Sequence, residues 1–151
     1  MLYYLLALLL VVIDQGVKFW VRSSIPLGGH VPFLPGLLEL SYVKNTGAAF
    51  SILTQHTWLL TLISLVVSAA VAYALAKDVM PHPLGRLSLA LILAGGMGNL
   101  IDRAFFGFVT DMFATTFMDF PVFNVADICV VIGVGLLVVC TFLFSDGEKK
   151  A

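Results

Sequence analysis

The sequence has few charged residues and too few cysteines for a cross-linked fold. Charged residues make up 11 % of its 151 positions, whereas about 25 % is typical of soluble globular domains. The 8 Lys and Arg residues against 9 Asp and Glu give a formal net charge of −1, so there is no basic surface for nucleic acid. Two cysteines, Cys129 and Cys140, cannot build a disulfide framework or a structural zinc site. These shortages argue against a soluble domain, a disordered chain and a nucleic-acid partner.

Long apolar runs are what the sequence has in abundance. Hydrophobic residues make up 60 % of the chain, and the mean hydropathy is +1.05. A helix needs roughly 20 mostly apolar residues to cross a bilayer. We therefore expect a mainly α-helical membrane protein, organised as one integral membrane domain over residues 1–151. Its four expected spans are 2–21, 58–76, 84–101 and 122–144.

The first apolar run is expected to be a retained span and not a cleaved signal peptide. No Lys or Arg precedes it, and no Ala-x-Ala motif follows it. Four spans place both termini on one side of the membrane. The positive-inside rule favours the cytoplasm for that side, because it carries four basic loop and tail residues against two on the other. The four are Lys77, Arg86, Lys149 and Lys150, and the two are Arg22 and Lys44.

The two connections on the outer side, residues 23–57 and 104–121, are rich in aromatic residues. Within the first, Leu38 to Tyr42 alternates between apolar and polar residues as a half-buried strand does. Aromatic residues favour the membrane–water interface. We therefore expect a small β-sheet that lies on the outer membrane surface.

Polar residues near the hydrocarbon all fall at one depth, close to the outer leaflet. An Asp at mid-membrane costs about 2.5–3.5 kcal/mol on insertion scales, so such residues are expected to pair or to act. On the helices, residues three or four positions apart share a face. The residues concerned are Asp14, Lys18, Asn99, Asp102, Arg103, Asn124 and Asp127 on the spans, with Asn45 and Asp111 in the connections.

Each small group also has an ordinary structural explanation. Asp14 and Lys18 form a possible i, i+4 ion pair that only fastens a helix. Asp102 and Arg103 are possible anchors of a helix end. In the same way, Asn124 suits an N-cap, and Asp127 suits the first turn of the helix that follows. Separate structural explanations for every group do not account for why all the groups lie at one depth. A single site that they share explains this better.

Other chemistries find little support in the sequence. His30, His56 and His82 are scattered over both sides of the membrane, so no metal ligand set is expected. Ser51 has no suitable base near it in the sequence, which argues against a nucleophilic serine. Two neighbouring Asp residues can share one proton, so that one activates water and the other polarises a carbonyl. Spacing alone leaves open which two Asp residues these are.

Five motifs follow one another along nearly the whole chain. They are Asp14-Gln-x-x-Lys18, Asn45-Thr-Gly-Ala-Ala-Phe-Ser51, Gly95-Gly-Met-Gly-Asn-Leu-Ile-Asp-Arg103, Gly107-Phe-Val-Thr-Asp111 and Phe123-Asn-Val-Ala-Asp127. Together, and in this order, they resemble the lipoprotein signal peptidase family, the type II signal peptidases of bacteria.

The resemblance implies an aspartyl endopeptidase of the bacterial cytoplasmic (inner) membrane that needs no cofactor. Such an enzyme removes the signal peptide from diacylglyceryl-modified prolipoproteins, just before the lipidated cysteine. It works among membrane lipids near the outer leaflet and is inhibited by globomycin. We expect the chain to act as a monomer.

The resemblance also assigns roles to individual residues. It implies that Asp111 and Asp127 are catalytic, and that the outer connections form a sheet-like cradle and a flap over the cleft. The residues implied to bind substrate or support the site are Asp14, Lys18, Asn45, Asn99, Asp102, Arg103 and Asn124. Two positions depart from the family pattern: Thr110 replaces a residue that is more often aliphatic, and Phe120 replaces a frequent Trp.

Two other functions remain open at this point. Asp14, Asp102 and Asp127 could form the relay of a small proton- or ion-coupled transporter. The carboxylates lie in one leaflet, however, and no inverted repeat is apparent. A membrane scaffold without activity would leave the clustered Asp and Asn residues unexplained.

Overall fold

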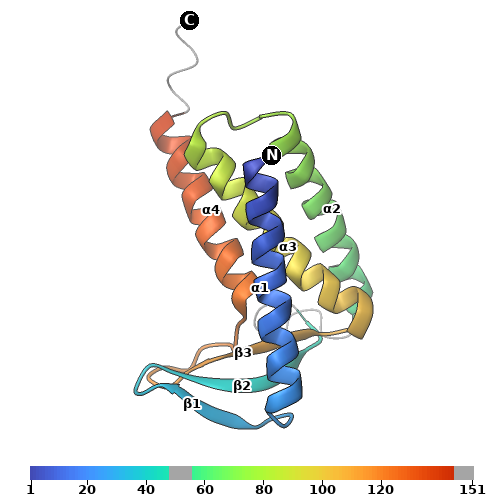
Figure 1. Cartoon of the computed structure of the whole chain (residues 1–151), viewed down its shortest axis with the longest axis vertical. Helices are drawn as coiled ribbons and strands as arrows, with labels where there is room; N and C mark the ends of the chain where they lie inside the picture. Colours follow the sequence, from blue (N-terminus) through green and yellow to red (C-terminus); the bar gives the residue numbers. More distant parts are fainter. Residues whose placement is uncertain (48–55, 145–151) are drawn as a thin grey trace, which may run out of the picture.

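The structure, a computed structural model, describes residues 1–47 and 56–144. Within this part of the chain, four helices are long and apolar enough to cross a membrane. Three short strands accompany them (Figure 1). In chain order the elements are α1 (Leu2–Ser24), β1 (His30–Leu34), β2 (Leu38–Asn45), α2 (Thr57–Ala76), α3 (Pro83–Phe106), β3 (Val109–Thr115) and α4 (Val125–Phe144).

Helix α3 is the centre of the bundle. It packs against α1, α2 and α4, and in Figure 1 it crosses behind α1. Two glycines permit this close packing, because a Cβ on Gly98 would lie 2.6 Å from Asp14 Oδ2 and one on Gly95 would collide with the Ala126 carbonyl. Half of the most apolar window of α3 is buried, against about a fifth in each of the other helices.

The outer faces of α1, α2 and α4 are apolar and exposed. Leu8, Val66 and Val131 are examples of large side chains that are more than half exposed. The buried set, in contrast, includes Asp14, Lys18 and other polar residues. Apolar residues outside and polar residues inside suit a protein surrounded by lipid, where every buried polar group must find a partner within the protein. The predicted fold class, a helical membrane protein with a small sheet, is confirmed.

The sheet lies across the end of the bundle where α1 finishes (Figure 1). Its strand order is β1-β2-β3, and both pairings are antiparallel. Lys44 of β2 pairs with Thr110 of β3, and Val43 pairs with Asp111. The alternating segment from Leu38 to Tyr42 lies within β2, as expected. The expected flap falls partly on residues 48–55, as does Ser51, and these lie outside the described residues.

Several helix ends differ from the expected spans. Helix α3 continues to Phe106 instead of ending near residue 101, and α1 continues to Ser24 instead of residue 21. The polar residues of α3 predict the end of a span, but Asp102 is paired with Lys18 inside the protein and the helix runs on. It stops at Gly107, whose φ of 75° is a left-handed conformation that glycine adopts without strain. Helix α4 begins at Val125, not at residue 122, because Asn124 provides the cap.

Candidate active site

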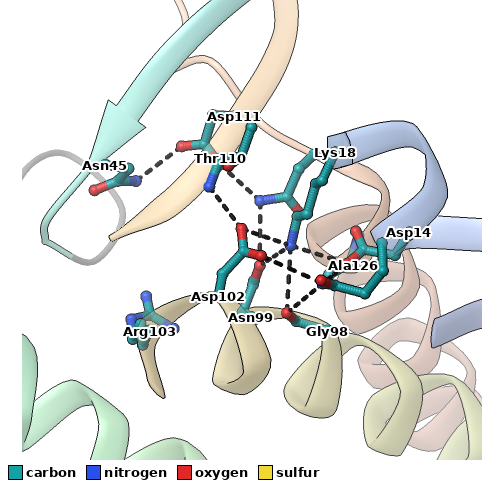
Figure 2. Close-up of polar contacts among 12 residues, drawn as sticks. Asp14, Lys18, Asn45, Gly98, Asn99, Asp102, Arg103, Thr110, Asp111 and Ala126 are labelled. Carbon is teal, nitrogen blue, oxygen red and sulfur yellow. Dashed lines mark hydrogen bonds and ion pairs between the residues drawn. The ribbon is translucent and has the colours of Figure 1, made fainter. Parts of the chain in front are cut away.

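Asp111 lies on β3 inside the protein, with only 2 % of the residue exposed. Both oxygens of its carboxylate accept hydrogen bonds from side-chain amides. Asn124 Nδ2 donates to Oδ1 at 2.6 Å, and Asn45 Nδ2 donates to Oδ2 at 2.9 Å (Figure 2). Asn45 ends β2 and Asn124 precedes α4. Two separate elements therefore fix the orientation of this carboxylate.

Asp127 lies in the first turn of α4, and Asn124 determines its position. Asn124 Oδ1 accepts a hydrogen bond from the Asp127 backbone N–H at 2.9 Å. Asp127 Oδ2 accepts one from the Asn124 backbone N–H at 3.2 Å. This reciprocal pattern satisfies two N–H groups that a helix start leaves free. The capping explanation is correct, but the same Asn124 side chain also reaches Asp111, so capping and the polar cluster are parts of one arrangement.

Asn99 on α3 connects Asp127 to Lys18. Its Oδ1 accepts hydrogen bonds from Lys18 Nζ at 2.9 Å and from Asn124 Nδ2 at 3.2 Å. Its Nδ2 donates to Asp127 Oδ1 at 2.8 Å. Because an ammonium group can only donate, the amide oxygen must face Lys18, and the amide nitrogen is then directed at Asp127. Lys18 thus determines which face Asn99 presents to the carboxylate.

Lys18 is completely buried and balances two carboxylates. Its Nζ lies 2.9 Å from Asp14 Oδ2 and 3.5 Å from Asp102 Oδ2, and it also donates to the Gly98 carbonyl at 3.4 Å (Figure 2). Asp14 Oδ1 in turn accepts the backbone N–H of Ala126, in the first turn of α4, at 2.9 Å. The group therefore joins α1, α3 and α4, and Asn99 links it to Asp127.

Arg103 follows Asp102 on α3 but faces a different region. Its Nη1 donates to Ser64 Oγ at 3.4 Å, and its Nη2 donates to the Gly47 carbonyl at 3.3 Å. Its buried Nε has no hydrogen-bond partner among the described residues. Adjacent residues on a helix diverge, as expected, so Asp102 joins the Lys18 cluster while Arg103 lines a cavity.

This cavity has a volume of about 570 Å³ and opens beside both aspartates. Its polar lining consists mainly of Asn45, Asn99, Arg103, Asp111 and Asp127. Most of the remaining lining is apolar, from the loop before α4 and from the helices. It includes Gly95, Gly96, Phe120, Pro121, Phe123, Val130, Val131 and Ile132. A carboxylate pair at the side of an apolar cavity is suited to chemistry on a substrate that is itself partly apolar.

Asp111 lies on the strand, outside the membrane-spanning helices, and its acidity is strongly altered. Burial raises the pKa of Asp111 from 3.8 to about 6, because burial disfavours the charged form. The charge of Asp127 acts in the same direction, whereas the amides of Asn45 and Asn124 and the charge of Lys18 favour ionisation. Asp111 therefore holds its proton to a higher pH than an ordinary carboxyl group.

The hydrogen-bond network joins most of the residues that the sequence singled out. Arg103 differs from the others, because it shares the cavity without bonding to any of them within the described structure. The network contains Asp14, Lys18, Asn45, Asn99, Asp102, Asp111, Asn124 and Asp127. Their chemical roles stay predictions.

Two further residues belong to the cluster, and neither is among the predicted site residues, although Gln15 lies within the first motif. Gln15 Nε2 donates to the Gly98 carbonyl at 3.0 Å and contacts Asp14 Oδ2 at 3.1 Å. Arg22 is expected in the loop after the first span, but it lies within α1, and its Nη1 is 3.5 Å from Asp102 Oδ1. Its spacing could have revealed it, because Lys18 and Arg22 continue the four-residue step from Asp14 along one helix face. Among the described residues, no His, Cys, Asp and Glu side chains are grouped to hold a metal ion.

Comparisons with known proteins agree with this architecture. The family model described as signal peptidase II matches residues 6–143. A lipoprotein signal peptidase of Streptococcus pyogenes is 44 % identical over 145 residues, which cover 96 % of this chain and 95 % of that protein. A second protein of that name from the same species is 43 % identical with the same coverage.

Two solved structures, both described as bacterial membrane enzymes, have the same fold. One has a TM-score of 0.87 at 30 % identity and covers 99 % of this chain and 91 % of that chain. The other has a TM-score of 0.85 at 30 % identity, with coverages of 94 % and 93 %. The fold and the buried polar site beside an apolar cavity thus define a bacterial membrane enzyme. The chain belongs to the signal peptidase II family, whose members are membrane peptidases.

Proposed function

We propose that this chain is an aspartyl endopeptidase that cleaves diacylglyceryl-modified prolipoproteins just before the lipidated cysteine. The observation that carries this proposal is the linkage of Asp111 and Asp127 through Asn124 at the side of the apolar cavity. Membership of the signal peptidase II family supports a prolipoprotein as the substrate. Residues 1–151 act as a single integral membrane domain in this proposal.

Asp111 and Asp127 divide the chemistry between them. Asp127 takes a proton from a water molecule, and the oxygen of that water attacks the scissile carbonyl carbon. Asp111, whose raised pKa of about 6 keeps it protonated up to about that pH, donates a hydrogen bond to the carbonyl oxygen. Collapse of the tetrahedral intermediate breaks the C–N bond, and the proton held by Asp127 passes to the departing amine. No covalent enzyme intermediate forms.

The surrounding amides and charges orient this pair. Asn45 and Asn124 hold Asp111, and Asn99 directs a donor at Asp127. The buried cluster of Asp14, Lys18 and Asp102 supports this arrangement through the bond from Lys18 to Asn99. Arg103 has a different role, which is to bind carbonyl groups of the substrate backbone in the cavity.

The apolar part of the cavity is suited to the lipid-modified substrate. Val130, Val131 and Ile132 line it from α4, which is one of the helices long enough to span the membrane. Acyl chains and an apolar signal peptide both gain free energy when they leave water for such a surface. Entry from the bilayer needs no passage through water. Globomycin, an inhibitor of the family, would compete for the same cavity, and one copy of the chain contains the whole proposed site.

We propose that both termini lie in the cytoplasm and that the site lies near the outer leaflet. Lys77 and Arg86 flank the connection between α2 and α3, at the end of the bundle away from the sheet. Basic residues in such short connections favour the cytoplasmic side. Cysteine-accessibility labelling from outside the cell would test this: a Cys at exposed Leu37 is expected to react, and one at exposed Lys77 is not.

The direct test of the function is cleavage of a defined substrate by purified protein in detergent. A diacylglyceryl-modified prolipoprotein and its unlipidated form would be compared, each with and without globomycin. We expect cleavage of the lipidated form alone, inhibition by globomycin, and a product whose mass shows that it begins with the lipidated cysteine. Lack of cleavage by folded protein would contradict the proposal, and proton flux in proteoliposomes would then favour the transporter.

A further inference from the structure

The back of strand β3 carries a second polar contact that the reaction described above does not use. Successive side chains of a strand point to opposite faces, so Thr110 faces away from the side on which Asp111 meets Asn45 and Asn124. Thr110 is nevertheless completely buried. Arg22 Nη1, from the last turns of α1, donates a hydrogen bond to Thr110 Oγ1 at 3.0 Å.

Asp102 completes this contact from α3. Its Oδ2 accepts the backbone N–H of Thr110 at 2.8 Å, as Figure 2 shows, and its Oδ1 lies 3.5 Å from Arg22 Nη1. The guanidinium of Arg22 also lies over the ring of Phe106, 4.5 Å from its centroid, where a cation is favoured. The backbone and the hydroxyl of Thr110 are therefore both held, from two different helices.

We propose that Arg22 and Thr110 are positioning residues that hold β3 so that the Asp111 carboxylate meets its two amides. The proposal rests on the proposed function, because it concerns the reaction of Asp111. Thr110 directly precedes Asp111, so fixing its backbone and side chain limits how far the next residue can move. A displacement of about 1 Å at a reacting group can cost about 100-fold in rate. The contact between Arg22 and Thr110 on one face of β3 thus helps to hold the Asp111 carboxylate in place on the other face.

The same contact could instead only stabilise the packing of the sheet against the helices. The two roles differ in whether a variant changes the unfolding temperature alone or also kcat. Loss of a contact that only stabilises the packing lowers the unfolding temperature and does not change kcat. A positioning contact lowers kcat while KM stays the same, because Arg22 and Thr110 are not among the residues that line the described cavity.

The test compares Thr110→Val, Arg22→Leu and the double variant, assayed with the lipidated substrate well below their unfolding temperatures. Thr110→Val removes the hydroxyl at nearly constant volume. We expect each single variant to lower kcat about tenfold with KM unchanged, the scale of one lost buried hydrogen bond. The double variant should lose about tenfold and not about 100-fold, because either change breaks the same contact. Thr110→Ser, which keeps the hydroxyl, should retain the wild-type kcat.

Lys44→Leu is the matched control. Lys44 pairs with Thr110 across the strands, so it lies on the same face of the sheet, and its ammonium lies 4.7 Å from the Phe108 ring centroid. Removing it deletes a cation from this face without touching Arg22, and kcat should not change. A kcat that stays at the wild-type value in Thr110→Val and Arg22→Leu, or losses that multiply in the double variant, would overturn the proposal.

Hydrogen exchange separates failure of this inference from failure of the proposed function. The amides of residues 109–115 should exchange faster in Thr110→Val and in Arg22→Leu than in wild type or Lys44→Leu. Unchanged exchange there overturns the positioning role whether or not the protein cleaves prolipoproteins. Wild-type protein that cleaves nothing overturns the function instead, and with it the positioning role.

Discussion

Asn124 donates a hydrogen bond to Asp111 at 2.6 Å with the same side chain whose oxygen caps α4. The cap fixes the rotation of the Asn124 amide, because its oxygen is committed to the backbone of Asp127. Its nitrogen must then point toward Asp111. The start of a helix and the orientation of a carboxylate on a distant strand are therefore determined by one residue.

The raised pKa of Asp111 predicts how activity depends on pH. In the proposed reaction Asp111 acts in its protonated form, and its pKa is about 6 in the free protein. We expect kcat/KM to fall as the pH rises through about 6, since kcat/KM reports groups of the free enzyme. A pH profile of initial rates, with wild type kept folded throughout, measures this. An increase of kcat/KM through the same range would assign Asp111 the role of the base.

Stability should depend on the same group. The Asp111 carboxyl keeps its proton up to about pH 6 when folded but releases it near pH 3.8 when unfolded. The folded state thus binds more protons between these values, so this group makes stability fall as the pH rises from about 4 to about 6, with no further change above. Asp111→Asn does not titrate and should remove this slope. Unfolding midpoints of wild type and Asp111→Asn at several pH values measure this difference. The same dependence of the midpoint on pH in both proteins would contradict the raised pKa of Asp111.

Lys18→Met should destabilise the protein strongly. The change leaves the carboxylates of Asp14 and Asp102 buried without the ammonium that lies 2.9 Å and 3.5 Å from them. Removing one partner of a buried ion pair costs about 3–5 kcal/mol. Denaturant unfolding in detergent would measure the loss. Lys77→Met, at an exposed position beyond α2, is the control and should leave the free energy of unfolding unchanged.

Arg103→Ala should weaken substrate binding more than it slows turnover. The guanidinium lines the cavity, and its Nη1 and Nη2 make long hydrogen bonds of 3.4 Å to Ser64 and 3.3 Å to Gly47, which a substrate carbonyl can replace. We expect a higher KM, and no recovery in Arg103→Lys, because Lys lacks the planar arrangement of donors. Steady-state kinetics distinguish these outcomes, with Arg86→Ala at the opposite end of the bundle as control. A wild-type KM in Arg103→Ala would refute the assignment.

The sequence predicts the helical part of the fold well because hydropathy alone identifies a membrane span. It also places the polar residues at one depth, since an unpaired charge in the hydrocarbon is too costly to occur by chance. Asp102 and Arg103 misled the prediction of where α3 ends. Polar residues at the end of an apolar run indicate the membrane surface, but here Lys18 pairs with Asp102 inside the protein.

The contacts between distant elements could not be predicted from the sequence. In the sequence, Arg22 resembles any basic residue at the end of a membrane span. Thr110 is noticed there only because the family more often has an aliphatic residue at this position. Their contact depends on how β3 is placed against α1, and such long-range packing has no local signal in the sequence. The register that pairs Lys44 with Thr110 is fixed in the same way, by tertiary contacts.

In the proposed reaction Asp127 activates water while Asp111 polarises the scissile carbonyl, and single-turnover cleavage by the Asn variants of both residues tests whether the reaction needs each of them. Asn is nearly the same size as Asp, but its amide neither accepts nor releases a proton near neutral pH. Each variant therefore removes proton transfer and keeps the shape of the side chain. Asp78→Asn, which removes an exposed carboxylate that pairs with Arg86 far from the site, is the matched control. We predict that Asp111→Asn and Asp127→Asn each lower the cleavage rate of lipidated prolipoprotein by about 1000-fold or more, while Asp78→Asn cleaves like wild type. Cleavage at the wild-type rate by either folded Asn variant of the pair would show that the reaction does not need that carboxyl group.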